Sequence, residues 1–131
     1  TAESMYHLAV VRHARGRYAP ADTLYRDALA VQRARAPGDD PHVARTLDAL
    51  GRLLQDRGQY APAERLTRDA LAMRRRLHGR DHADVAAGLG HLAYQLQLQG
   101  RVAEAEPLLR EALAMQERLH GPEHPDVAAS R

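Results

Sequence analysis

Two pairs of histidines have the spacing closest to that of a metal site. His78 and His82 are four positions apart, and His120 and His124 repeat this spacing 42 residues later. Two histidines at this distance on one helix can bind zinc. Each pair instead encloses a glycine, which indicates a loop, and the chain has no cysteine to complete a ligand set. We therefore expect no metal site and no cofactor.

The densest positive charge is the run Arg74-Arg75-Arg76. We expect it in the last turns of a helix, where exposed carbonyl groups attract cations. No aromatic side chain lies near it in the sequence to stack on bases. The joint absence of Lys, Ile, Asn and Phe indicates GC-rich coding, so the use of Arg for every cation says little about partners. We therefore expect no nucleic-acid partner. Binding of that class would show a strongly salt-dependent affinity.

No group of residues in the sequence suggests catalysis. Ser4 and Ser130 are the only serines, and neither lies in the Gly-x-Ser-x-Gly turn that exposes a hydrolase nucleophile. The nine glycines never cluster into a phosphate-binding loop. Acidic pairs such as Glu104 and Glu106 fall near expected helix starts, where negative charge is stabilising. The sequence therefore predicts a protein that is not an enzyme.

A repeat of 42 residues organises the elements that would position these side chains. Gly16, Gly58 and Gly100 are separated by this period, and residues 43–84 and 85–126 are identical at 22 of 42 positions without a gap. A fixed period of this length is typical of stacked repeats, in which each unit buries its apolar face against its neighbours. The predicted units of a single array over residues 1–131 are 1–42, 43–84 and 85–126.

Within one unit the apolar residues recur with helical periodicity. Val43, Leu47, Leu50 and Leu54 form one stripe of an amphipathic helix. Gly58 follows, and glycine tolerates the left-handed conformation that ends helices. A second stripe then leads to the next loop, so the unit is two helices joined by a tight turn. The predicted helices lie near residues 2–14, 20–35, 43–56, 61–77, 85–98 and 103–119.

The expected fold is therefore all-α, a right-handed α-solenoid of three helix-turn-helix hairpins with six main helices. Residues 127–131 are expected to start a seventh helix, which would make the chain a fragment of a longer protein. Small residues recur where two helices of a hairpin must approach closely, because a larger side chain would overpack the contact. These expected close contacts are Ala9, Gly51 and Ala93 in the first helices and Ala21, Ala63 and Ala105 in the second.

Hydropathy and charge bear on the location of the protein and on the kinds of partner that it can bind. No apolar run approaches the roughly 20 residues that a membrane span needs, and we expect no membrane partner and a cytoplasmic location. The formal net charge is only +2, but the middle unit has 9 Arg against 6 acids and the third has 3 against 6. Such asymmetry can attract a partner or promote head-to-tail self-association.

The repeat resembles the tetratricopeptide repeat. The shared features are Leu followed by Ala or Gly in the first helix, Gly at the turn, Ala early in the second helix and Ala-Leu later in it. The 42-residue length and the linker at residues 120–128 are similar to the kinesin-light-chain variety. The resemblance implies no motor, because similar repeats are widespread in bacterial signalling and assembly proteins, and a bacterial source is expected.

The resemblance implies a concave groove, formed by the first helices, that holds a protein or peptide partner. Carried over by position, the groove would be lined by Glu3, Tyr6, His7, Val10, His13, Arg45, Asp48, Ala49, Arg52, Gln55, Ala87, Gly90, His91, Tyr94 and Gln97. Arg45 and Arg52 are seven residues apart on one helix face, so both could bind a carboxylate. Tyr6 and Tyr94 could serve as aromatic anchors.

The sequence departs from the family in one respect that bears on the partner. Relatives that hold extended peptides commonly use Asn in the groove to bind the peptide backbone, and this chain has no Asn. Ala49 and His91 occupy the positions where Asn is common. This departure favours a helical or folded partner with acidic and apolar groups over an extended peptide.

Two functions therefore remain open from the sequence. The first is a non-catalytic interaction or adaptor module that binds its partner in the groove. The second is a structural spacer or self-assembly segment, in which uncapped end hairpins lead to concentration-dependent association.

Overall fold

The protein is described here as a computed structural model over residues 1–79 and 81–120. The described residues form helices and connecting loops, with no strand among them. The six predicted helices are confirmed, although all but the first begin one or two residues earlier than expected. Their bounds are α1 Ala2–Ala14, α2 Tyr18–Arg35, α3 Pro41–Asp56, α4 Tyr60–His78, α5 Ala83–Leu98 and α6 Val102–His120.

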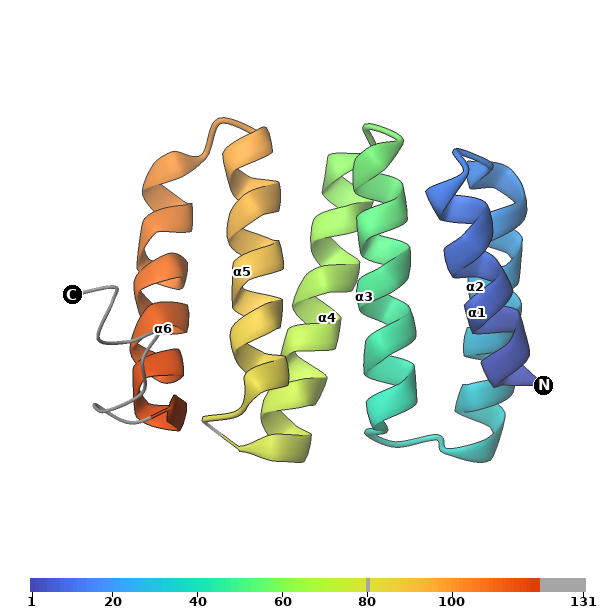
Figure 1. The fold of residues 1–131 in the computed structure, drawn as a ribbon, viewed down its shortest axis with the longest axis horizontal. Helices are drawn as coiled ribbons and strands as arrows, with labels where there is room; N and C mark the ends of the chain where they lie inside the picture. The colour runs from blue at the N-terminus through green and yellow to red at the C-terminus, as the bar shows by residue number, and fades with distance from the viewer. Residues whose placement is uncertain (80, 121–131) are drawn as a thin grey trace.

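The helices pair into three antiparallel hairpins that stand side by side in sequence order (Figure 1). Each turn within a hairpin contains a glycine with positive φ: 76° at Gly16 and 78° at both Gly58 and Gly100. The residue after this glycine donates its N–H to a carbonyl of the preceding helix, as Gln59 does to Leu54 at 2.8 Å. This bond satisfies a helix-end carbonyl, and glycine is favoured because side chains disfavour positive φ.

The small residues lie where the sequence predicted close helix contacts. Ala9, Ala21, Ala63, Ala93 and Ala105 are all fully buried. In the middle hairpin the approach is closest at Gly51, where an added Cβ would lie 2.7 Å from Thr67 Oγ1 and 3.2 Å from the Ala63 carbonyl oxygen. The small residues on the first and second helix of each hairpin therefore determine how closely these two helices approach each other.

Buried polar pairs and surface ion pairs join one hairpin to the next. Thr46 Oγ1 on α3 donates to Gln32 Oε1 on α2 at 2.8 Å, and Gln95 Nε2 on α5 donates to Thr67 Oγ1 on α4 at 2.8 Å. The loop acid Asp39 accepts two hydrogen bonds from Arg76. The same bidentate pair recurs one repeat later between Asp81 and Arg118. The Asp–Arg contact between hairpins thus follows the 42-residue period, whereas the two buried polar pairs lie at different repeat positions.

Among the described residues, no helix is both long enough and apolar enough to cross a membrane. Pro107 is the sixth residue of α6, and the helix continues through it. The predicted start of a further unit at 127–131, and His124, lie outside the described residues.

Candidate functional site

The face formed by the first helices carries one exposed side chain from each hairpin at the same repeat position. These are Val10 on α1, Arg52 on α3 and Tyr94 on α5, which we call the exposed row. Their exposed fractions are 41% for Val10, 49% for the Arg52 side chain and 52% for Tyr94. Because α3 contacts both α1 and α5, the row presents an apolar, a cationic and an aromatic group side by side.

A hollow of about 320 Å³ opens between α1 and α3 beside the first two members of the row. Its lining is Val10, His13, Ala14, Tyr25, Arg52, Gln55 and Asp56. His13 Nε2 lies 2.5 Å from Asp56 Oδ2, which joins the two helices. Burial raises the pKa of Tyr25 to about 12, so its phenol is a neutral group at physiological pH.

Asp48 lies beneath the row and is only 3% exposed. Its Oδ2 atom lies 2.9 Å from His91 Nδ1, 3.8 Å from Arg74 Nη1 and 3.9 Å from Arg52 Nε. Burial acts to raise the pKa of Asp48, but the His91 hydrogen bond and the charges of His91, Arg74 and Arg52 outweigh it and lower the pKa below its ordinary value. The ionised carboxylate therefore holds groups from α3, α4 and α5 together.

Arg45 and Tyr6 make contacts within the chain. Arg45 Nη2 donates to Glu3 Oε2 at 2.7 Å, and its guanidinium lies 4.1 Å from the centre of the Tyr6 ring. Tyr6 is 9% exposed and packs edge-on against Tyr25, with ring centres 5.8 Å apart. The hydrogen bond from Arg45 is the main reason that the pKa of Glu3 is lowered. Arg45, Tyr6 and Glu3 thus join α1 to α3.

The other predicted groove residues differ in exposure. His7 is exposed, with Nε2 3.0 Å from Glu3 Oε1, and Gln97 is also exposed. Gln55 and His91 are half-buried. Ala87 is exposed, Gly90 is half-buried and Ala49 is buried. The structure therefore brings Val10, His13, Arg52 and Gln55 around one hollow and leaves Tyr94 and Gln97 on the neighbouring helix.

Sequence reasoning missed the part that Arg74 plays in this site. The sequence predicts Arg74 as part of a cationic run in the last turns of a helix, but its side chain is only 12% exposed and reaches towards Asp48. The equivalent residue one unit earlier, Gln32, is also buried, and the sequence shows only that the two residues are one period apart. The position faces the next hairpin in both units.

The histidine pair discussed above does come together with a carboxylate. Ligating atoms of His78, His82 and Asp84 lie within 4.8 Å of one another. The two imidazole rings stack at 3.8 Å with an angle of 10° between their planes, so their in-plane lone pairs do not converge on one point. His82 Nδ1 accepts the N–H of Asp84 at 3.0 Å and caps α5. This arrangement serves the helix start, and the absence of a metal site stays a prediction.

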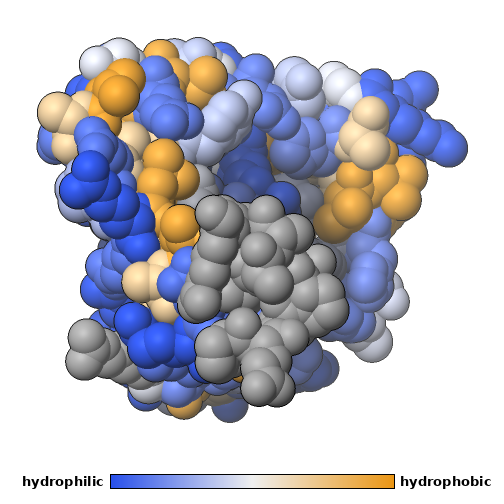
Figure 2. Space-filling model, turned by 60° about the vertical axis from the view of Figure 1, so that its left-hand side comes forward, coloured by the Kyte–Doolittle hydropathy of each residue, from blue (hydrophilic) through white to orange (hydrophobic). Residues whose placement is uncertain are grey.

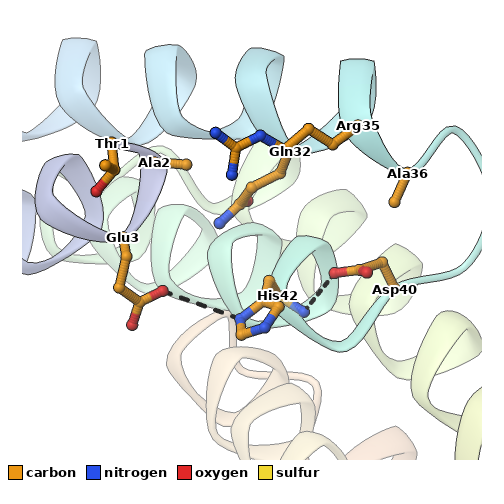
Figure 3. Close-up of a pocket in the computed structure, with 8 residues that line it drawn as sticks. All are labelled: Thr1, Ala2, Glu3, Gln32, Arg35, Ala36, Asp40 and His42. Carbon is orange, nitrogen blue, oxygen red and sulfur yellow. Dashed lines mark hydrogen bonds and ion pairs between the residues drawn. The ribbon is translucent and has the colours of Figure 1, made fainter.

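A second cavity, of about 180 Å³, lies between the first hairpin and the start of α3 (Figure 3). Its lining is Thr1, Ala2, Glu3, Gln32, Arg35, Ala36, Asp40 and His42. Asp40 is used as the cap of α3, since its Oδ1 accepts the His42 N–H at 2.8 Å. His42 Nδ1 is 3.9 Å from Glu3 Oε2. Carboxylates and cations are mixed around this cavity, so it offers no strong preference for a charged ligand.

Comparison with known proteins agrees with this architecture. The tetratricopeptide repeat profile matches residues 1–76, and a second tetratricopeptide repeat profile matches residues 85–126. No curated protein sequence matches the chain. Repeats of this family generally mediate protein–protein interaction or scaffolding, and they are typically non-catalytic.

Two solved structures have the same fold. The first is a kinesin light chain protein of Podosopora anserina with nearly identical TPR-like repeats, at 27% identity and a TM-score of 0.82 over 98% of this chain and 61% of that one. The second is BtubC (BKLC) from P. vanneervenii, at 23% identity and a TM-score of 0.87 over 98% of this chain and 52% of that one. The chain thus spans about half to three-fifths of their length. It belongs to the tetratricopeptide repeat family and is of its kinesin-light-chain-like kind.

Proposed function

We propose that the chain is a non-catalytic adaptor module that binds a segment of a partner protein across the face formed by α1, α3 and α5. The observation that carries the proposal is the exposed row, because it places an exposed Arg52 and an exposed Tyr94 at one repeat position, beside the exposed Val10. Aromatic residues and Arg are the types enriched at interface hot spots.

The chemistry of the row indicates what the partner segment contains. Arg52 lies 3.9 Å from Asp48, whose charge is also balanced by His91 at 2.9 Å. The Arg52 guanidinium therefore keeps donors available for a carboxylate of the partner. Val10 and Tyr94 on either side favour apolar groups. We propose a helical or folded segment with an acidic residue flanked by apolar ones.

Arg45 has partners within the chain, and these support a different role for it in the proposal. Its guanidinium is already paired with Glu3 and stacked on Tyr6. We propose that Arg45, Tyr6 and Asp48 support the binding face, while Val10, Arg52, Tyr94, His91, Gln55, His7 and Gln97 contact the partner. Under this division Arg52 and Tyr94 can be changed without removing the Arg45–Glu3 and Asp48–His91 contacts that join the hairpins.

A direct test uses three variants of the chain as baits in its source lysate, followed by affinity measurement with the purified partner. Arg52→Glu and Tyr94→Ala should each weaken binding by at least tenfold, as expected for hot-spot residues. Arg65→Glu reverses an exposed charge on α4, away from the row, and should bind like the wild type. Capture of the same proteins by all baits, with equal affinity, would contradict the proposal.

The proposed function requires neither a cofactor nor catalysis. The absence of nucleic-acid and membrane partners, the cytoplasmic location and the bacterial source stay predictions from the sequence.

A further inference from the structure

The outer face of α6 carries apolar side chains that inner hairpins bury. Leu109 is 42% exposed and Leu113 is 50% exposed. Figure 2 brings this end of the array forward and shows hydrophobic surface beside the grey residues. The residues at the same positions of α2 and α4 are covered by the following hairpin. Their exposed fractions are 1% and 8% for Tyr25 and Leu29, and 0% and 7% for Thr67 and Leu71.

The opposite end of the array carries the complementary half of this contact. Leu8 and Val11 on α1 are 42% and 43% exposed. The equivalent residues of α3 and α5 are at most 1% exposed. Leu50, Leu53 and Leu92 belong to the buried hydrophobic clusters, and Gln95 is the buried polar residue that bonds Thr67 of the preceding hairpin. Both ends therefore present exposed apolar side chains at the repeat positions that are buried between hairpins inside the chain.

Polar groups at the two ends also match. Inside the array Asp22 lies 3.8 Å from Arg57, and Glu64 lies 2.7 Å from Arg101. Glu106 on α6 occupies the repeat position of Asp22 and Glu64. Arg15 and Arg17 occupy the repeat positions of Arg57 and Arg101, so they would lie opposite Glu106 when a second copy follows the first. The buried bond from Thr46 to Gln32 has its counterpart in Ser4 and Gln116. The carboxylate, the two cations and the hydroxyl–amide pair are all present in the sequence.

We propose that copies of this chain associate head to tail, with α6 of one copy receiving α1 of the next in the register that joins hairpins inside the chain. The evidence is charge complementarity together with exposed apolar residues at both ends. A contact of this kind uses two different surfaces of each copy, so it leads to rings or open chains rather than a closed twofold dimer.

One pair in this register is unfavourable. Arg75 Nη2 lies 2.5 Å from Glu111 Oε2 inside the chain, and the equivalent pair between copies is Glu117 with Asp27, two acids. Asp27 is exposed and Glu117 half-buried, so salt screens much of their repulsion. Replacing Glu117 with Arg should tighten the association, because it restores the opposite-charge pair that Arg75 and Glu111 form inside the chain.

Residues 127–131 are the competing occupant of the α6 face, because their sequence begins as residues 85–89 do. In the 131-residue chain used for the test below, this segment offers only five residues. The α1 helix of a second copy has 13 residues and is held by its own hairpin. The second copy is therefore favoured at high protein concentration.

The test is sedimentation velocity over a concentration series of the 131-residue chain. Leu8→Glu blocks one end and Leu113→Glu blocks the other, and both side chains are exposed, so neither variant should lose its fold. Each variant alone should stay monomeric where the wild type associates. An equimolar mixture should form a 1:1 dimer, because the intact α6 face of Leu8→Glu can receive the intact α1 of Leu113→Glu. Both outer ends of that dimer are blocked, so nothing larger should form. Val102→Glu, at a residue 57% exposed on α6, should associate like the wild type.

Three outcomes would overturn the proposal. The first is a wild type that stays monomeric at about millimolar concentration, which would mean that the chain's own residues 127–131 or another partner cover α6. The second is association that Leu8→Glu leaves unchanged, and the third is a mixture that stays monomeric. Glu117→Arg gives an independent check, since it should lower the concentration needed for half-association severalfold. None of these variants alters the exposed row, so failure here would leave the adaptor proposal untouched.

Discussion

Asp48 shows at the scale of a single residue how the candidate site is built. A groove position was expected to present its side chain to a partner, but Asp48 is buried and holds His91, Arg74 and Arg52. The neighbour four residues away, Arg52, is visible from helical spacing. His91 and Arg74 come from other helices and reach Asp48 only because the hairpins stack.

Replacing Asp48 with Ala should destabilise the chain by about 3 kcal/mol, because removing one partner leaves buried positive charge without compensation. Urea denaturation followed by circular dichroism would measure this loss. Asp69→Ala, at an exposed position of α4, is the matched control and should change stability by about 0.5 kcal/mol or less. A loss below about 1 kcal/mol for Asp48→Ala would contradict the burial of an ionised carboxylate.

The same residue should make stability depend on acid pH. The pKa of Asp48 in the folded chain lies below its ordinary value of 3.8, so the unfolded chain binds a proton more readily than the folded one. The contribution of Asp48 is therefore complete above about pH 4 and is lost as the pH falls through the lowered pKa. The urea midpoint should drop in this range for the wild type, and less steeply for Asp48→Asn. Parallel curves for the two proteins would contradict the prediction.

At the scale of the helix, the close packing of α3 against α4 depends on the glycine at position 51. Helix bounds and turns followed from period and glycine placement, since apolar spacing and positive φ are local properties. The residue that a helix position meets on the other helix depends on tertiary packing and does not follow from local sequence. Gly51 lies against Thr67, which is fully buried and cannot move aside.

Two glycine substitutions on neighbouring helices should have opposite effects. Gly51→Ala should cost about 1–3 kcal/mol, because the new Cβ would lie 2.7 Å from Thr67 Oγ1. Gly90→Ala on α5 meets no atom within 4 Å and should gain about 0.5–1 kcal/mol from a better helix-forming residue. Denaturation midpoints of the two variants test this directly. Stabilisation by both would show that α3 and α4 are farther apart than described.

At the scale of the whole molecule, stability is shared unequally along the array. Ten residues of α3 are buried, compared with three in α1 and three in α6. In a stacked array each hairpin is stabilised chiefly by its neighbours, so the two ends have less support than the middle.

Hydrogen exchange should therefore be slowest in α3 and faster in α1 and α6, because local opening costs least where few apolar contacts are lost. Mass spectrometry of peptic fragments would resolve the three helices. Equal protection along the chain would contradict this gradient in dilute protein. At high concentration, the head-to-tail association proposed above should raise protection in α1 and α6 and leave α3 unchanged.

The sequence by itself determined the hairpins, because a 42-residue period of apolar stripes, small residues and turn glycines specifies local conformation and the faces to be buried. It also placed Val10, Arg52 and Tyr94 at one repeat position, since that requires only the period. Tertiary structure decided which groove positions reach the surface. Tyr6 and Asp48 stand at the same position of the repeat and are both buried, and Arg45 is paired with Glu3. The physical reason is that ion pairing and burial depend on distances between hairpins, which the period alone does not fix.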